Sequence, residues 1–273
     1  MEMCDVVRSH TVLLILNSNP STMHIIPVID LMGGEVVHAI AGERSQYHPI
    51  QTVLTNASTP RAIGRALRDS LQASSTYVAD LDAIGGAPLA WDAYRSLSES
   101  GLRLWLDAGI SSPEQANHLM TENLSLQIID RLILGLESIP QPTVLQQVIS
   151  SVGTDACVFS LDLRAGAPIV QADGWQGYTA VDIVDVAVNA GVSTIIVLDL
   201  AQVGTGQGVG TVKLCQQLSQ RWPNVSLVAG GGIRHLSDLE ELEDSGCHAA
   251  LIASALHDGR LTRSMLLDAG HAL

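Results

Sequence analysis

Two aspartates end apolar segments at matched places in the chain. Asp30 closes HIIPVID at 24–30, and Asp162 closes ACVFSLD at 156–162. If these segments are parallel strands, both carboxyl groups lie at the edge where such folds build their active sites. Opposed carboxyl groups can differ in protonation, so that one acts as a base and the other as an acid. We therefore predict Asp30 and Asp162 as catalytic residues; the alternative is that each only caps its following turn.

A turn of small residues occurs twice, as LWLDAGISS at 104–112 and as LVAGGGIRH at 227–235. In the second copy the glycines allow a tight turn that exposes backbone N–H groups. The following apolar segment ends in ASA at 253–255, whose hydroxyl and N–H groups can join them. Donors from two such loops form an anion site. The predicted phosphate-binding residues are Gly231, Gly232, Ile233, Ala253 and Ser254.

The first copy of the turn carries Asp107 where the second carries Gly230, and Glu137 ends the next apolar segment. A carboxylate repels a nearby phosphate strongly when water is scarce. We therefore expect Asp107 to contact a cationic, hydroxylated or neutral end of the ligand. The mismatch between the two copies predicts a substrate with one phosphate.

Four further side chains are candidates for substrate binding. Asp80 and Asp199 end apolar segments, and either contact substrate or fix loops by accepting N–H bonds. Thr205, in VGTGQG, could donate a hydrogen bond to substrate. Trp175, in a DGW loop, could stack on a flat ring.

These residues must be positioned by alternating strands and helices. Strands are predicted at 24–30, 76–82, 102–107, 128–135, 156–162, 193–199, 225–230 and 248–254. Helices are predicted at 59–73, 112–121, 142–151, 180–190, 211–221 and 236–245. Eight apolar strands alternating with helices predict an α/β fold, a closed (β/α)8 barrel. A doubly wound open sheet is the alternative, but IDLMGG is not the glycine-rich dinucleotide turn that it would need.

An internal repeat supports the barrel. PVIDLMGGEVV matches FSLDLRAGAPIV, VADLDAIGG matches VLDLAQVGTG, LDAGIS matches AGGGIR, and LILGLES matches LIASALH. The four matches occur in the same order, about 120 residues apart. This order indicates a half-barrel that was duplicated and fused.

The composition excludes several classes of partner. A formal charge of −14 argues against nucleic acid, and no apolar run is long enough to span a membrane. Four dispersed cysteines indicate reduced thiols in a cytoplasmic protein, and the histidine spacing predicts no metal site; no cofactor is expected. The single lysine, Lys213, falls in a predicted helix, which disfavours a Schiff-base aldolase. Residues 1–22 are expected to be a disordered extension or to precede the true start at Met23, with 23–273 forming one barrel.

From Met23 to about residue 265 the chain resembles the histidine-biosynthesis barrels, which are the ProFAR isomerase and the cyclase subunit of imidazole glycerol phosphate synthase. The similar segments are PVIDLMGGEVV, VADLDA, VFSLDLRAG with a following GW, AGGGIR, and D-x-x-x-x-G-T from Asp199 to Thr205. The resemblance implies that Asp30 is the general base and Asp162 the general acid of an Amadori rearrangement. It also implies that Thr205 and Trp175 bind substrate and that loops 231–233 and 253–255 hold a phosphate.

The chain departs from that family at specific places. LDAGIS replaces a glycine-rich turn, and Ala201 and Val203 stand where acidic residues are usual. GERSQYHPI at 42–50 is similar to a divergent isomerase-like group associated with methanofuran-type one-carbon pathways. Three hypotheses remain. They are a ProFAR-type isomerase, a paralogue acting on a singly phosphorylated metabolite as lyase, cyclase or isomerase, and a non-catalytic ligand-binding barrel. Each takes a small phosphorylated metabolite, and the sequence predicts no oligomeric state.

Overall fold

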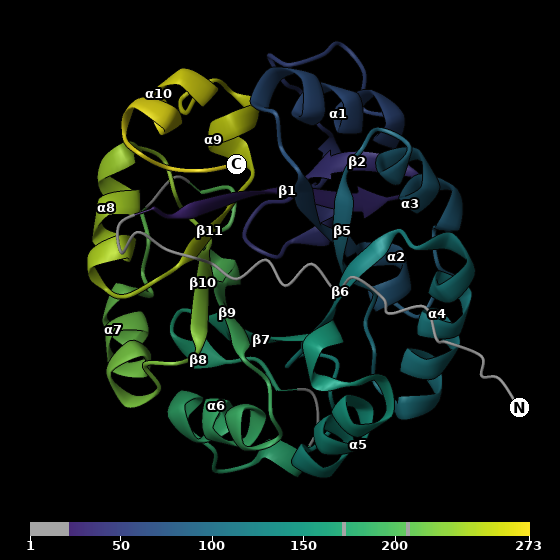
Figure 1. Ribbon diagram of the computed structural model, residues 1–273, viewed down its shortest axis with the longest axis vertical. Helices are drawn as coiled ribbons and strands as arrows, with labels where there is room; N and C mark the ends of the chain where they lie inside the picture. The colour runs from purple at the N-terminus through teal and green to yellow at the C-terminus, as the bar shows by residue number, and fades with distance from the viewer. Residues whose placement is uncertain (1–21, 171–172, 206–207) are drawn as a thin grey trace, which may run out of the picture.

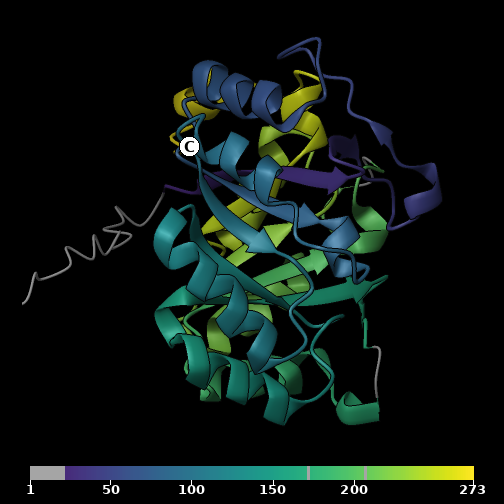
Figure 2. The ribbon, with the colours of Figure 1, turned by 90° about the vertical axis from the view of Figure 1, so that its right-hand side faces the viewer.

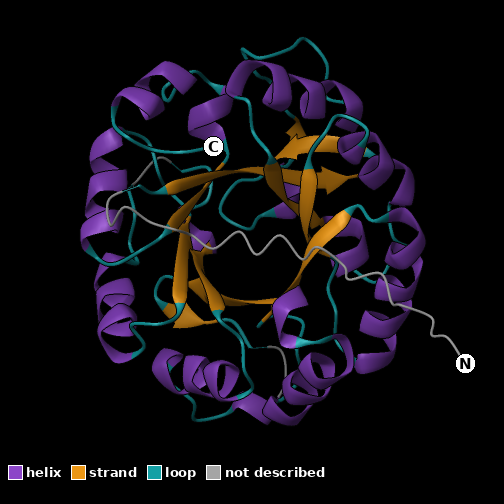
Figure 3. Ribbon diagram, viewed as in Figure 1, coloured by secondary structure: helices purple, strands orange, loops and turns teal. Residues whose placement is uncertain are grey.

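The computed structural model describes residues 22–170, 173–205 and 208–273. Its central feature is a ring of parallel strands in the order β1, β4, β5, β6, β7, β9, β10 and β11, closed by pairing of β11 with β1 (Figure 1). Helices surround this ring on the outside (Figure 3). The predicted (β/α)8 barrel is therefore confirmed, and the open sheet is excluded. The expectation for residues 1–22 concerns a segment that, apart from residue 22, lies outside the described residues.

The strands are β1 (His24–Met32), β2 (Glu35–His38), β3 (His48–Pro49), β4 (Ser75–Asp80), β5 (Arg103–Asp107), β6 (Ile129–Gly135), β7 (Cys157–Arg164), β8 (Ala167–Pro168), β9 (Thr194–Asp199), β10 (Ser226–Gly230) and β11 (Ala249–Ile252). The helices are α1 (Pro60–Ala66), α2 (Leu81–Ile84), α3 (Trp91–Ser98), α4 (Pro113–Leu126), α5 (Pro142–Val152), α6 (Ala180–Asn189), α7 (Val212–Arg221), α8 (Leu236–Asp244), α9 (Ser254–His257) and α10 (Arg263–Asp268).

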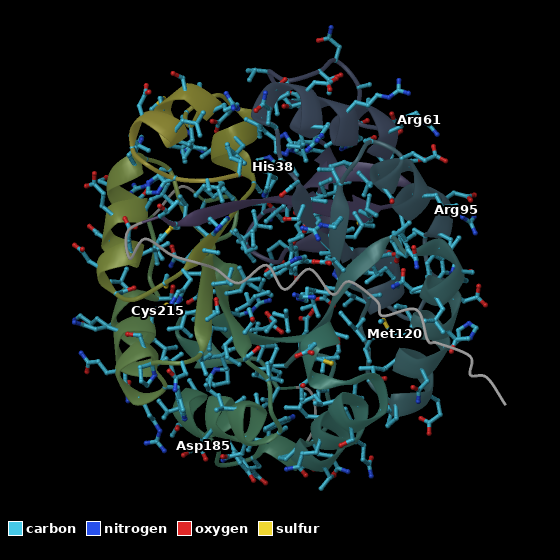
Figure 4. The ribbon with its side chains drawn as sticks, viewed as in Figure 1. His38, Arg61, Arg95, Met120, Asp185 and Cys215 are labelled. Atoms are coloured by element: carbon cyan, nitrogen blue, oxygen red, sulfur yellow. The ribbon has the colours of Figure 1, made fainter. Side chains whose placement is uncertain are left out.

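The barrel strands are apolar on both faces because helices cover the outside and a packed core fills the inside. In β7, every residue except Arg164 is buried. The residues that pack in the interior of the ring are Ile26, Tyr77, Ala79, Ile133, Val158, Ile196, Val228, Ala249 and Leu251. Side chains fill the space inside the ring (Figure 4), as expected for a barrel that is a core and not a pore.

Some predicted boundaries differ from the structure. The strand predicted at 76–82 ends at Asp80, because the Asp80 carboxylate accepts the N–H of Ala83 and caps α2. The helix predicted at 59–73 is α1, continued by a π-turn at Leu67–Leu71 and ended by the left-handed residue Gln72. Helices α2, α3, α9 and α10 were not predicted.

Two antiparallel hairpins extend the carboxyl ends of β1 and β7, the first and fifth strands of the ring. Figure 2 shows the strand arrows pointing to one side of the barrel, where the β2–β3 hairpin projects. Asp82 accepts the N–H of Gly33 at 2.6 Å in the first hairpin turn. Asp199 accepts the N–H groups of Ala165 and Gly166 at 3.0 and 2.8 Å in the second. Both turns are thus fixed by a carboxylate that follows the neighbouring strand.

Other expectations concern single residues and the membrane. Cys157, Cys215 and Cys247 are free and buried, as predicted, whereas Cys4 lies outside the described residues. Lys213 is exposed on α7, and it lies on a helix as predicted. Within the described ranges, no helix has the length and apolar character to cross a lipid bilayer.

Asn123, near the end of α4, fixes the start of β6. Its side-chain oxygen accepts the N–H groups of Ile128 and Ile129 at 3.0 and 2.9 Å, and its amide donates to the carbonyl of Ile129 at 2.9 Å. Because Asn123 is only 8% exposed, truncation leaves these backbone groups without partners in a dry environment.

We expect Asn123→Ala to lower the free energy of unfolding by about 2 kcal/mol in urea denaturation. Leu124→Ala on the same helix is the control: Leu124 is 77% exposed, so its loss changes stability by less than about 0.5 kcal/mol. Equal effects of the two substitutions would contradict the anchoring role of Asn123.

Candidate active site

A cavity of about 270 Å³ lies at the carboxyl ends of the barrel strands. Asp30 from β1 and Asp162 from β7 both line it, and they come from opposite sides of the ring. Asp107, at the end of β5, lines it as well. The predicted phosphate residues Gly231, Gly232, Ile233, Ala253 and Ser254 form another part of its wall. The structure therefore brings the two predicted catalytic acids and the predicted phosphate loops to one cavity.

Asp30 has the environment of a base that works near neutral pH. Burial raises the pKa of its carboxyl to about 7. A carboxylate with this pKa can take a proton from carbon and release it again without a large penalty in either direction. The arrangement at the end of β1 thus suits a general base.

Asp162 has the environment of an acid. The Ser160 hydroxyl donates to its Oδ1 at 2.6 Å, and the backbone N–H of Glu137 donates to its Oδ2 at 3.3 Å. Burial raises the pKa of Asp162 well above the usual range, and the nearby Asp107 and Glu137 raise it further. The hydrogen bonds from Ser160 and Glu137 oppose this rise, and the net shift favours the protonated carboxyl that a general acid requires.

Tyr77 lies among these acids and was not among the residues predicted from the sequence. Its hydroxyl donates to Asp107 Oδ2 at 3.1 Å. Burial raises the pKa of Tyr77 well above its usual value, and Asp107, Asp162 and Asp30 raise it further. The phenol therefore stays protonated and remains a donor. The available signal was its inward position in a predicted strand, two residues before Ala79, which also packs inside the ring.

Three arginines line the cavity, and none of them was predicted. Arg44, from the turn after β2, donates to the carbonyl of Leu81 at 3.2 Å. Arg164 pairs with Glu43 at 3.7 Å, and Arg260 pairs with Asp258 at 2.6 Å. Guanidinium groups suit a phosphorylated ligand because they can donate two hydrogen bonds to a phosphate.

The glycine turn after β10 is required by its backbone. Gly231 and Gly232 have φ angles of +89° and +84°. A Cβ at Gly232 would lie 2.0 Å from the carbonyl oxygen of Gly208. Across the cavity wall, the Ser254 hydroxyl lies 3.1 Å from His38 Nε2. These features leave a small, polar wall where an anion can approach the backbone.

The matching turn after β5 is built differently. Gly109 keeps a left-handed φ of +69°, but Ala108 does not share the left-handed conformation of Gly231. Ala108, Gly109 and Ile110 line a separate hollow of about 560 Å³ beside Trp91 and Gln115. Of this turn, Asp107 is the residue that lines the central cavity. The first-half turn thus offers the cavity a carboxylate in place of a glycine-lined wall.

Asp80 and Asp199 hold loops and do not line the cavity. Asp80 accepts the N–H groups of Ala83 and Ala90 and the hydroxyl of Tyr94. Asp199 accepts the N–H of Ala201 in addition to those of the β7–β8 turn. Both carboxylates are buried and accept hydrogen bonds from backbone N–H groups. Of the two roles considered for them, they therefore fix loops and do not contact substrate in this arrangement.

Trp175 and Thr205 also differ from expectation. Trp175 is buried, and its indole N–H donates to the carbonyl of Ile139 at 2.8 Å, because Gly174 packs closely against Pro140 and Gln141. The Thr205 hydroxyl donates to the carbonyl of Gln202 at 2.9 Å. Neither side chain lines the cavity in this arrangement, although Gly204, beside Thr205, does.

The raised pKa of Asp30 predicts a pH-dependent stability. An unfolded aspartate has a pKa of about 4, so between pH 5 and 8 the unfolded chain is ionised while the folded one loses its proton only near 7. The free energy of unfolding therefore falls as pH rises through this window. We expect the stability advantage of Asp30→Asn over the unsubstituted protein to grow by roughly 2 kcal/mol from pH 5 to pH 8 in urea denaturation. A constant difference would refute the raised pKa.

Comparison with known proteins agrees with this geometry. A family profile described as "Histidine biosynthesis protein" matches residues 24–262. A protein from Leuconostoc mesenteroides is 29% identical over 250 residues, which cover 89% of this chain and 98% of that protein. A protein from Dehalococcoides mccartyi is 30% identical over 245 residues, covering 88% and 96% respectively. Both are named 1-(5-phosphoribosyl)-5-((5-phosphoribosylamino)methylideneamino) imidazole-4-carboxamide isomerase.

A third relative, an uncharacterized protein from Methanocaldococcus jannaschii, is 30% identical over 246 residues, covering 90% of this chain and 98% of that protein. The similarity spans nearly the whole barrel, including both predicted catalytic acids and the glycine turn. The chain belongs to the histidine biosynthesis protein family.

Proposed function

We propose that this protein is an isomerase of the ProFAR type, which converts a phosphorylated aminoaldose into an aminoketose by acid–base catalysis. The observation that carries the proposal is the position of Asp30 and Asp162, which face one cavity from opposite strands with their pKa values raised. The isomerase names of the relatives support it. The free, buried thiols of Cys157, Cys215 and Cys247 support a reducing, cytoplasmic setting.

The two acids have separate tasks in this reaction. Asp162 gives its proton to the ring oxygen, and the C1–O bond breaks to leave an iminium at C1. Asp30 then takes the proton from C2, and the C–H electron pair forms the enolamine. Asp30 returns this proton to C1, and the hydroxyl proton at C2 passes to Asp162, which gives the aminoketose and restores both carboxyl groups. The pKa of about 7 at Asp30 suits a group that must both accept and return a proton.

The glycine-lined wall is proposed to hold the phosphate of this substrate. Gly231, Gly232 and Ser254 supply neutral donors, and Arg260 lines the same cavity. A phosphate bound at this wall would hold the sugar over the two acids. The binding energy of the phosphate would thus align the sugar for proton transfer.

A second candidate is an isomerase or related enzyme for a singly phosphorylated metabolite. It is favoured by the first-half turn, where Asp107 faces the cavity and the Ala108–Gly109 backbone faces elsewhere. Titration calorimetry with mono- and bis-phosphorylated sugars separates the candidates. Equal affinity for the two ligands supports a single phosphate site, and a gain of tenfold or more for the second phosphate supports the two-phosphate substrate.

The catalytic roles predict a specific loss of turnover. We expect Asp30→Asn and Asp162→Asn each to lower kcat for ProFAR isomerisation at least 100-fold, with KM changed only a few-fold, because proton transfer is lost and binding is not. Asp185→Asn on the outer face of α6 (labelled in Figure 4) is the control and should retain full activity.

The same variants can be tested in a histidine auxotroph that lacks the isomerase. Rescue by the unsubstituted protein and not by either aspartate variant supports the proposal. Rescue by both variants would show that the protein has the activity but does not depend on these two aspartates, and no rescue by well-expressed protein would remove the narrow ProFAR assignment.

The phosphate wall predicts a loss of affinity. Removing the hydroxyl by Ser254→Ala deletes one hydrogen bond to a charged group, so KM should rise about tenfold with kcat nearly unchanged. Ser138→Ala, in the loop after β6 and outside the cavity, is the matched control and should leave KM unaltered. A larger rise of KM in Ser138→Ala than in Ser254→Ala would indicate that the phosphate binds in the other half of the barrel.

A further inference from the structure

Asp107 and Asp162 approach the same side of Gly135, at the end of β6. A Cβ at this glycine would lie 3.1 Å from Asp162 Oδ2 and 3.5 Å from Asp107 Oδ2. Both carboxyl groups are buried, at 5% and 4% exposure. The absence of a side chain at residue 135 is therefore what allows the two acids to approach each other.

The direct partners of this carboxyl pair are neutral donors. Asp107 accepts the Tyr77 hydroxyl at Oδ2 and the N–H of Gly109 at Oδ1, each at 3.1 Å. Asp162 accepts the Ser160 hydroxyl and the N–H of Glu137. Among the described charged groups, Glu137 acts on both acids and Arg44 acts on Asp107 from the exposed rim. Two such carboxylates in a dry site resist ionising together, and they behave as a coupled pair.

The partners decide which acid holds the proton. Burial raises the pKa of Asp107 to about 6, while hydrogen bonds from Gly109 and Tyr77 and the charge of Arg44 oppose the rise. Burial raises the pKa of Asp162 well above the usual range, Asp107 is the next cause, and hydrogen bonds from Ser160 and Glu137 oppose the rise. The charge of Arg44 is named for Asp107 and not for Asp162, so it favours the ionised form of Asp107, and a charged Asp107 favours the protonated form of Asp162.

We propose that Asp107 is a positioning residue that, with Tyr77, holds the transferable proton on Asp162 across Gly135. This proposal rests on the proposed function in assigning Asp162 as the acid. It also gives the carboxylate in the first-half turn a use. In the second half the matching residue is Gly230, directly before the wall residues Gly231 and Gly232, whereas in the first half Asp107 keeps the proton on Asp162.

The proposal can be tested without substrate by following the carboxyl carbons of labelled aspartates by NMR over a pH series. Asp162→Asn identifies the resonance of Asp162. In Asp107→Asn the midpoint for Asp162 should fall by about one pH unit or more, because the neighbouring negative charge is gone. Asp107→Gly introduces the residue that the second half has at the matching position, Gly230. It should also lower the Asp162 midpoint, and it replaces Asp107→Asn in the test if that variant folds poorly.

Tyr77→Phe provides a second arm. Loss of the phenol should raise the midpoint of Asp107, because its ionised form loses a donor. Glu137→Gln removes the other negative charge near the pair, and its Asp162 midpoint is compared with that of the Asp107 variants. An Asp162 midpoint that stays within about 0.3 pH units in both Asp107 variants would overturn the proposal, as would a shift produced by Glu137→Gln alone.

Activity gives an independent readout. If the protein is the proposed isomerase, the alkaline limb of the kcat–pH profile should move to lower pH in Asp107→Asn by the same interval as the NMR midpoint. An NMR shift without any isomerase activity would support the proposed role of Asp107 in the carboxyl pair and reject the proposed reaction. Activity with an unshifted profile and an unshifted NMR midpoint would keep the reaction and reject the role of Asp107.

Discussion

Burial of acidic side chains without a cation beneath them is the constraint on which the site depends. The closed ring with its packed interior excludes water below the cavity, and the hydrogen-bond partners of Asp107 and Asp162 are hydroxyl and N–H donors. The cations lie at the mouth, where the Arg164 side chain is half exposed. In such a setting the acids cannot all be charged. Some of the carboxyl groups therefore stay protonated at the place where a proton-transfer reaction needs a proton donor.

The two halves of the barrel show which parts of a duplicated turn are fixed by backbone geometry and which are free to change. Gly109 and Gly232 both adopt left-handed φ angles in close contact with neighbouring backbone, so each half needs glycine there. The residue two positions earlier does not adopt a left-handed φ; it is Asp107 in one half and Gly230 in the other, where a Cβ would lie 3.0 Å from Leu251 Cβ. The duplication thus gives one half an anion wall and the other a carboxyl group.

Carboxylates at strand ends in this barrel serve two purposes that the sequence does not separate. Asp30 and Asp162 face the cavity, whereas Asp80 and Asp199 accept backbone N–H groups and fix loops. All four follow apolar strands of similar composition. The difference arises from the register of the strands: Asp30 pairs with Ala79 and Asp162 with Leu198, which line the cavity, whereas Asp80 and Asp199 lie one residue further along and so point to the other face of the sheet.

The sequence by itself determined the barrel, the duplication, the cysteine state at three positions, and the meeting of Asp30, Asp162 and the glycine turn. These follow from strand periodicity and chain order, because the carboxyl ends of parallel strands must lie on one face. Only the tertiary structure decided that Tyr77 and three arginines line the cavity, that Trp175 packs in the core, and that Asp107 meets Asp162 over Gly135. These depend on side-chain direction and on contacts between distant loops, which the order of elements along the chain does not fix.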